Sequence, residues 1–346
     1  VPGAADAAFI QASHTVTLTQ NEAVGDLHIS TGTTDASNGG DGKVVLGENV
    51  LELNGKLRSY FAALGTTPGT SSDVPPTQAL TMTPASAGRL RVVGSSRLLT
   101  YAGEWAANAT ANTSLFHIEI AAPDATIVVN APVKAGDWTL VSGVLDVNDF
   151  RIPVDRGTTV AGNVTIGAAA TLISGASGTA GNAVVSRTTS AAGGALTVNG
   201  RLVLKGNNPY IAMTTISLAG AVEYAGANQT LARATSGGAT PNVYSTLVLT
   251  NTGAKTLGAV TTVTTRLVRG GTSSLALGSN TLTYGSNASI EYAGTAAQTT
   301  GPELPAAIDS LVIANSAGVT LSASTTVSTL LDLATGDLAT GANMLD

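Results

Sequence analysis

The densest group of chemically capable side chains lies near the middle of the chain. Three carboxylates and two guanidinium groups stand close together at Asp146, Asp149, Arg151, Asp155 and Arg156. Polysaccharide lyases use clustered Asp with Arg or Lys, and glycoside hydrolysis requires two carboxylates at a set separation. A solvated turn rich in ion pairs has the same composition and is the preferred interpretation. We therefore expect a protein that is not an enzyme.

A second candidate is a loop of oxygen ligands spaced by three, at Asp35, Asn38 and Asp41. Calcium takes carboxylate and amide oxygens of this kind. The spacing does not match an EF-hand, no Glu closes the loop, and Asx turns explain the same residues. The prediction is no cofactor, with calcium at these three residues as the alternative.

Aromatic side chains provide a third candidate, at Tyr101, Trp105 and Trp138. Exposed together as a strip, these rings would form a carbohydrate-binding surface. Packing of the same rings in the core is the alternative, because aromatic residues dominate core energetics.

The remaining residue types indicate no further site. His14, His28 and His117 have no Glu or His at metal spacing, and His14 and His28 are expected at exposed strand ends. The chain contains neither Cys nor a Gly-x-Ser-x-Gly nucleophile motif. Its net charge of -6 argues against nucleic acid, which requires a basic face.

The elements that must position these residues are repetitive. Tyr-Ala-Gly occurs at 101–103, 224–226 and 292–294, each time followed by a loop, a short apolar strand, a polar turn and another strand. The last two tyrosines lie 68 positions apart. Repetition on this scale is typical of stacked units.

Composition favours many short strands. Charged residues make up 11% of the chain, against roughly 25% in typical soluble domains, and 40 of the 346 residues are Gly. Apolar residues occur in runs of three to five, and no run is long enough for a transmembrane helix.

The Asn-Gly dipeptides at 54–55 and 199–200 lie between strand-like segments. Asn-Gly is the strongest hairpin signal, which would give an antiparallel meander. The Asn-Gly dipeptide also suits a tight corner of a coil, because both residues tolerate left-handed backbone dihedrals. In addition, the Tyr-Ala-Gly repeat unit recurs in order along the chain. The prediction is therefore an all-β parallel β-helix, or β-solenoid, with inserted loops; tandem β-sandwich repeats are the alternative.

Four segments are expected along the chain. They are N-terminal rungs (1–65), a Pro/Ser/Thr-rich insertion with a return strand (66–97), a middle β-helix with a degenerate repeat (98–220), and two C-terminal repeats (221–288 and 289–346).

The repeat residues also resemble a known family. Val-Glu-Tyr-Ala-Gly at 222–226, Tyr-Ser-Thr-Leu-Val-Leu-Thr-Asn at 244–251, Lys-Thr-Leu at 255–257 and Asn-Thr-Leu at 280–282 resemble large secreted repeat proteins of Bacteroidota, cargo-like proteins of type IX secretion. The resemblance covers 221–346 well, the first thirty residues fairly and the middle weakly. It implies a right-handed parallel β-helix, export across the outer membrane, and a role in adhesion, surface coats or filaments, without shared catalytic residues.

These observations predict an exported structural protein that self-assembles into an extracellular filament or surface layer. A solenoid leaves unpaired backbone groups at its first and last rungs, and Leu330–Leu345 shows no polar cap. Matching ends would add head to tail, so the expected partners are copies of the chain. A cell-surface adhesin that binds carbohydrate is the alternative, and a polysaccharide-degrading enzyme ranks third. We expect an extracellular or cell-surface protein whose signal peptide has been removed.

Overall fold

The structure, a computed structural model, describes residues 3–11, 14–31, 43–61, 80–81, 88–94, 117–128, 135–149, 152–154, 162–175, 185–187, 194–207, 209, 211–231 and 242–346. Every regular element in these ranges is a β-strand. No helix among them is long and apolar enough to span a bilayer. The all-β prediction is confirmed.

In chain order, the strands are β1 (Ala8–Ile10), β2 (Thr15–Thr17), β3 (Glu22–Val24), β4 (Leu27–Thr31), β5 (Lys43–Val45), β6 (Val50–Leu53), β7 (Leu57–Phe61), β8 (Leu80–Thr81), β9 (Arg89–Val92), β10 (His117–Val128), β11 (Trp138–Asp146), β12 (Ile152–Val154), β13 (Val164–Ser174), β14 (Val185–Arg187), β15 (Ala195–Val198), β16 (Arg201–Leu204), β17 (Ile211–Ala212), β18 (Thr215–Leu218), β19 (Ala221–Tyr224), β20 (Gln229–Leu231), β21 (Asn242–Leu249), β22 (Ala254–Leu257), β23 (Thr261–Gly270), β24 (Ser274–Ala276), β25 (Leu282–Tyr284), β26 (Ser289–Ala293), β27 (Gln298–Thr299), β28 (Ala307–Ala314), β29 (Val319–Thr320), β30 (Thr326–Thr335) and β31 (Leu338–Ala339).

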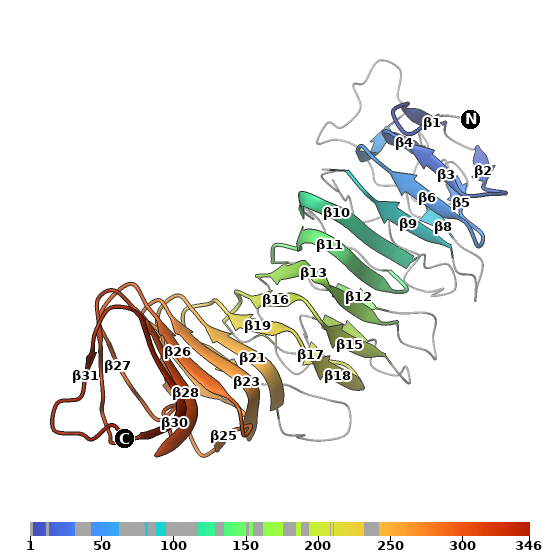
Figure 1. Cartoon of the computed structure of the whole chain (residues 1–346). Coiled ribbons are helices and arrows are strands. Elements are labelled where there is room, and N and C mark those ends of the chain that lie inside the picture. Colours follow the sequence, from blue (N-terminus) through green and yellow to red (C-terminus); the bar gives the residue numbers. More distant parts are fainter. Residues whose placement is uncertain are drawn as a thin grey trace. The chain divides into compact units, whose positions relative to one another are not determined.

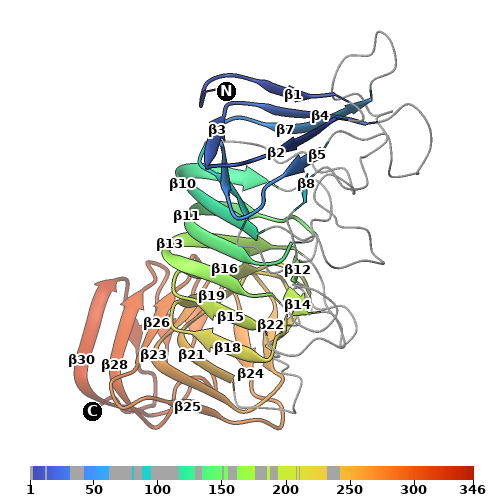
Figure 2. The same cartoon turned by 90° about the vertical axis from the view of Figure 1, so that its right-hand side faces the viewer.

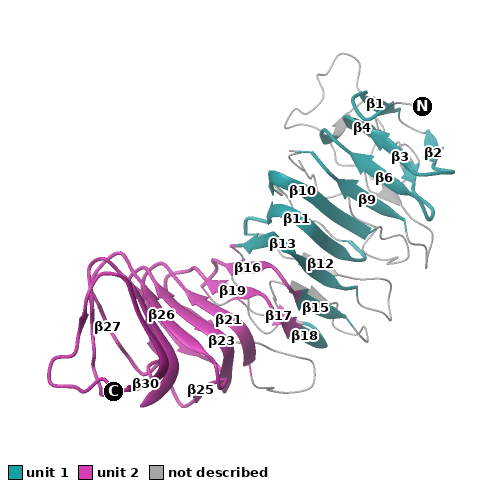
Figure 3. Cartoon of the chain, in the orientation of Figure 1, with its two compact units in different colours: residues 1–174, 184–197, 213–216 teal, residues 175–183, 198–212, 217–346 magenta. Residues whose placement is uncertain are grey.

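The chain divides into two compact units, shown in Figure 3. The first contains residues 1–174, 184–197 and 213–216, and the second contains 175–183, 198–212 and 217–346. The finer four-part division expected from the sequence stays a prediction.

In the first unit, three successive strands make one turn of a three-sided coil. Each strand pairs in parallel with its counterpart one turn later, which gives the sheets β1-β4-β7, β2-β5-β8 and β3-β6-β9 (Figures 1 and 2). The last of these sheets continues through β10, β11 and β13. Strands that follow one another in the chain therefore lie in different sheets, joined by corners.

The second unit repeats the coil. Its main sheet has the order β16-β19-β21-β23-β26-β28-β30, and its short strands form the sheets β20-β22-β24 and β27-β29-β31. The register of β21 with β23 shifts once and that of β28 with β30 shifts twice, as happens at β-bulges. The pairings within these sheets are parallel. They confirm the predicted β-helix and exclude the sandwich alternative, which is built from antiparallel sheets.

Strand register explains the 68-residue repeat. Tyr224 pairs with Leu249, Leu249 with Arg269, and Arg269 with Tyr292. The repeat therefore spans three coils and returns a tyrosine to the same column of the stack.

The glycine of Tyr-Ala-Gly is required by a glutamine that follows it. Gln229 Oε1 accepts a hydrogen bond from the Gly226 amide at 2.9 Å, while its Nε2 donates to the Leu204 carbonyl of the preceding coil at 2.9 Å. A Cβ at Gly226 would lie 2.6 Å from the Lys205 carbonyl oxygen and 2.8 Å from the Gln229 amide group. The tripeptide thus provides a corner in which a buried glutamine ties adjacent coils together.

The Asn-Gly dipeptide at 54–55 is also a corner. It lies between β6 and β7, which belong to different sheets, so it does not form a hairpin. A Cβ at Gly55 would lie 2.6 Å from the Gly25 carbonyl oxygen, which leaves no room for a larger residue where the coils approach.

The core consists of aliphatic columns inside the coil. In the second unit, one column contains four fully buried residues in register: Leu247, Leu267, Ile290 and Leu311. In the first unit, an equivalent buried column contains Leu53, Val92, Ile120, Leu140 and Ile166. Stacking of identical or similar residues from one turn to the next supplies the apolar burial that stabilises the coil.

Candidate functional site

The alternative calcium ligands Asp35, Asn38 and Asp41 lie outside the described residues. Within the described ranges, no group of three or more His, Asp or Glu side chains is placed to hold a metal ion.

The Asp/Arg cluster is described only at its start. Asp146 Oδ1 accepts a hydrogen bond from the Asn148 amide at 2.9 Å, in a turn where Asn148 has a φ of 49°. Asp149 is exposed in the same turn. The turn interpretation accounts for these two residues, whereas Arg151, Asp155 and Arg156 lie outside the described side chains.

The aromatic candidate is also partly outside the described residues, at Tyr101 and Trp105. Trp138 is 1% exposed and pairs in register between Ile118 and Val164 inside the first unit. Its ring belongs to the core, so it does not present a surface for carbohydrate.

The histidines are placed in three different ways. His14 is exposed as predicted, but His28 is buried, and the prediction of an exposed strand end is wrong there. The Phe9 ring stacks on His28 with centroids 4.4 Å apart, because the two residues are paired on adjacent strands. His117, the first residue of β10, has its Nδ1 3.1 Å from Asp137 Oδ2.

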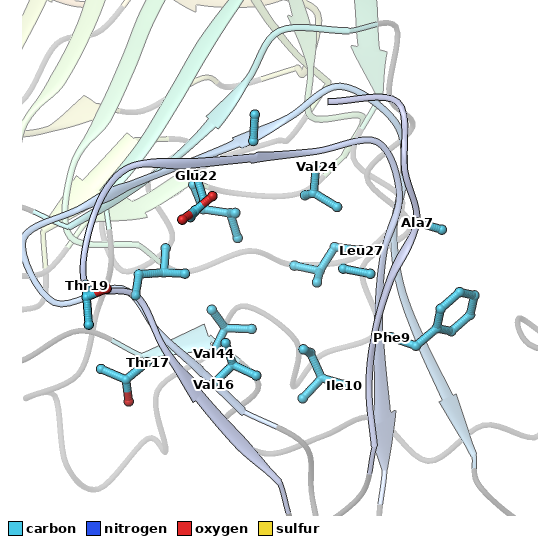
Figure 4. A pocket seen from close by; sticks show the side chains of 14 residues that line it. Ala7, Phe9, Ile10, Val16, Thr17, Thr19, Glu22, Val24, Leu27 and Val44 are labelled. Carbon is cyan, nitrogen blue, oxygen red and sulfur yellow. The ribbon is translucent and has the colours of Figure 1, made fainter. Parts of the chain in front are cut away.

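An apolar opening lies at the N-terminal end of the first unit (Figure 4). It has a volume of about 510 Å³ and is lined by residues of β1, β2 and β3 together with Leu27, Val44 and Leu51 of the next coil. Side chains of Ile10, Val16, Val24 and Leu27 line it, and Figure 4 shows them directed inward. The opening is therefore the inside of the first described coil, which no described strand covers.

Each strand of this coil has one partner among the described strands. β1 pairs with β4, β2 with β5, and β3 with β6. No described strand pairs with the other edge of β1, β2 or β3, and the backbone amide and carbonyl groups of such an edge can pair with a further strand.

The last coil of the second unit leaves apolar residues exposed. Leu331 pairs with Leu311 and continues its buried column, but Leu331 itself is 42% exposed. Leu333, two residues later on the same face of β30, is 52% exposed. These two residues occupy core positions that no described coil covers.

Backbone pairing is also incomplete there. The residues near Leu345 bridge to Thr325 and cover the start of β30, where the Val327 amide donates to the Asp346 carbonyl at 2.8 Å. Among the described strands, the second half of β30 pairs only with β28, and β31 pairs only with β29.

Both ends are acidic. No Lys or Arg precedes Lys43, and no Lys, Arg or His follows Arg269. Asp6, Glu22 and Asp26 lie near the first coil, and Asp332, Asp337 and Asp346 lie in or beside the last one. Two such ends brought together would repel each other at low salt.

The densest polar chemistry described is a buried network in the second unit. The Arg269 guanidinium contacts Glu303 Oε1, which also accepts hydrogen bonds from Tyr292 OH and the Gly301 amide, both at 2.9 Å. Arg269 additionally donates to the Ser273 and Thr299 carbonyls at 2.9 Å. The Glu303 side chain is 0% exposed, so no substrate can reach it.

Burial and the Glu303 carboxylate raise the pKa of Tyr292 well above its ordinary value. The same two causes raise the pKa of Tyr284, whose hydroxyl donates to the Glu303 carbonyl at 2.6 Å. This network was not predicted from the sequence. Its only local signal is Arg269 itself, a charged residue in the inward column that holds Tyr224 and Tyr292.

A second buried cation lies nearby in the same unit. Lys255 Nζ donates to the carbonyls of Ala227 at 2.8 Å and Thr252 at 3.2 Å, and also to that of Gly226. Burial lowers the pKa of Lys255 to about 8. The side chain ties the corner after Tyr-Ala-Gly to the next coil, which is a structural role.

No known protein family, curated protein or solved structure matches the chain. The candidate site is therefore defined by geometry alone, and among the described residues the features left open to a partner are the first and last coils.

Proposed function

We propose that the protein is an exported structural solenoid that assembles with copies of itself, the last coil of one copy pairing with the first coil of the next. The observation that carries this proposal is the exposure of Leu331 and Leu333 at core positions beside the unpaired half of β30.

The geometry of the two ends supports the pairing. The first coil is three-sided and presents three open strand edges around an apolar opening. The last coil presents β31, the second half of β30 and the chain beside Leu345. Parallel strand addition between such coils continues the pairing already present along each unit, and a contact between unlike ends grows a filament.

Apolar burial would provide part of the driving force. Covering a half-exposed leucine contributes about 1 kcal/mol or more, so Leu331 and Leu333 together contribute about 2–3 kcal/mol. Repulsion between the acidic ends opposes this contribution. We therefore expect association to strengthen as salt rises, because salt screens the repulsion.

The test is sedimentation velocity and electron microscopy of the full chain over a wide range of concentration, at low and high salt. The double variant Leu331→Asp/Leu333→Asp should remain monomeric. Val243→Asp is the matched control, since Val243 is 45% exposed on β21 and lies away from the end coil.

Fibres or oligomers of the parent chain and of the Val243 variant, but not of the double variant, would support the proposal. A chain that remains monomeric throughout would refute it. Assembly that persists in the double variant would show that the contact lies elsewhere.

A further inference from the structure

One residue in the N-terminal opening does not fit the column in which it stands. Glu22 pairs in register with Leu51, and the column continues through Leu90, Ile118, Trp138 and Val164. Every later member of this column is at most 5% exposed. The first described coil thus has a carboxylate at a position that is apolar in each of the next five coils of the stack.

The carboxylate faces the opening. Figure 4 shows the Glu22 side chain on the inner side of β3, among the apolar side chains of the coil. Gln20 Nε2 donates to Glu22 Oε1 at 2.9 Å and holds it near the rim. Among the described side chains, no basic group lies within ion-pairing distance of Glu22.

A coil stacked on this end would cover Glu22 as the first described coil covers Leu51. An ionised carboxylate removed from water is strongly unfavourable unless a cation or several hydrogen-bond donors meet it. The last coil of a second copy brings no cation, because no Lys, Arg or His follows Arg269. Inward-pointing charges at sheet edges are a known means of preventing unwanted strand pairing.

We propose that Glu22 is the residue that determines what can stack on the N-terminal coil, disfavouring a purely apolar coil edge. This inference rests on the proposed end-to-end association and concerns its strength. Glu22 keeps the contact weak and reversible, and it favours a covering coil that brings a donor to the carboxylate. The first and last described coils therefore differ: Leu331 continues an apolar column in the last coil, whereas Glu22 places a carboxylate in an otherwise apolar column of the first coil.

The test compares Glu22→Leu and Glu22→Gln with the parent chain by sedimentation velocity over a wide range of concentration. Glu48→Leu is the matched control, because it makes the same substitution at an exposed turn one coil away. Circular dichroism checks that each variant keeps its strand content. We expect Glu22→Leu to associate at a concentration lower by roughly tenfold or more, Glu22→Gln to be intermediate, and Glu48→Leu to match the parent.

The outcomes separate this inference from the proposed function. If the parent chain and Glu22→Leu both associate, and Glu22→Leu associates more strongly, the proposed function and the role of Glu22 are both supported. Association of Glu22→Leu alone supports the role of Glu22 and overturns self-assembly of the parent chain. If the parent chain and Glu22→Leu associate equally, the role of Glu22 is overturned but the proposed function is not. The same holds if Glu48→Leu gains as much association as Glu22→Leu. Monomers in every case overturn both.

Discussion

Replacement of Arg269 by Met tests how the second unit is held together. The substitution removes the guanidinium that meets Glu303 Oε1 but keeps a long apolar side chain in the column. The Glu303 carboxylate would then lose its cation at 0% exposure, with Tyr292 and Gly301 as its described donors. Removing one partner from a buried ion pair costs about 3–5 kcal/mol.

The same strand contains a matched control. Arg266 pairs with Glu291, but the Arg266 side chain is 47% exposed, so Arg266→Met should cost about 1 kcal/mol or less. Adding Glu303→Gln to Arg269→Met should recover part of the loss, because the uncompensated charge disappears while the contact with Tyr292 is kept.

Urea unfolding followed by circular dichroism gives the free-energy differences, and hydrogen exchange locates them in the second unit. The exchange measurement is needed because a solenoid can unfold one part at a time. The reasoning fails if Arg269→Met is within about 1 kcal/mol of Arg266→Met, or if the double variant is no more stable than Arg269→Met.

Three further predictions follow from named contacts. Gly294→Ala should destabilise the second unit by about 2 kcal/mol in urea unfolding, since its Cβ would lie 2.7 Å from the Gly271 carbonyl oxygen; a neutral result would contradict the corner geometry. Trp138→Ala should cost about 3–5 kcal/mol as a core truncation, and a change in glycan binding without loss of stability would refute its placement. Burial lowers the pKa of Lys255 to about 8 in the folded chain. Above pH 8 the folded chain therefore loses the Lys255 proton, while the unfolded chain keeps it. The stability attributable to Lys255 should therefore rise from about pH 8 towards pH 10, and Lys255→Met, unlike Lys205→Met, should abolish that rise in urea titrations.

The repeats allowed the architecture to be predicted, but not every placement within it. Short apolar runs, Asn-Gly corners and the recurrence of Tyr-Ala-Gly predicted a parallel coil, because each turn must repeat its inward residues to build a continuous core. The same local pattern did not predict that the side chains of Trp138 and His28 are buried. Their burial depends on residues one turn away in the stack, which local alternation does not reveal.

The buried network shows the same limit. Arg269 and Glu303 are widely separated in the sequence, and neither is part of a motif. They meet because Arg269 falls in an inward column and Glu303 lies in a later coil that closes over it. Their pairing required the register between coils.

The sequence by itself determined the strand-forming texture, the absence of cations near both ends and the repeat of 68 residues, because these are properties of composition and order along the chain. Only the tertiary structure decided which residues share a column. Register sets a carboxylate at Glu22 against Leu51, and leaves Leu331 uncovered beside Leu311. A one-residue change of register would turn each of these side chains to the opposite face of its sheet. Whether each one faces the core therefore depends on pairing between turns that are distant in the sequence.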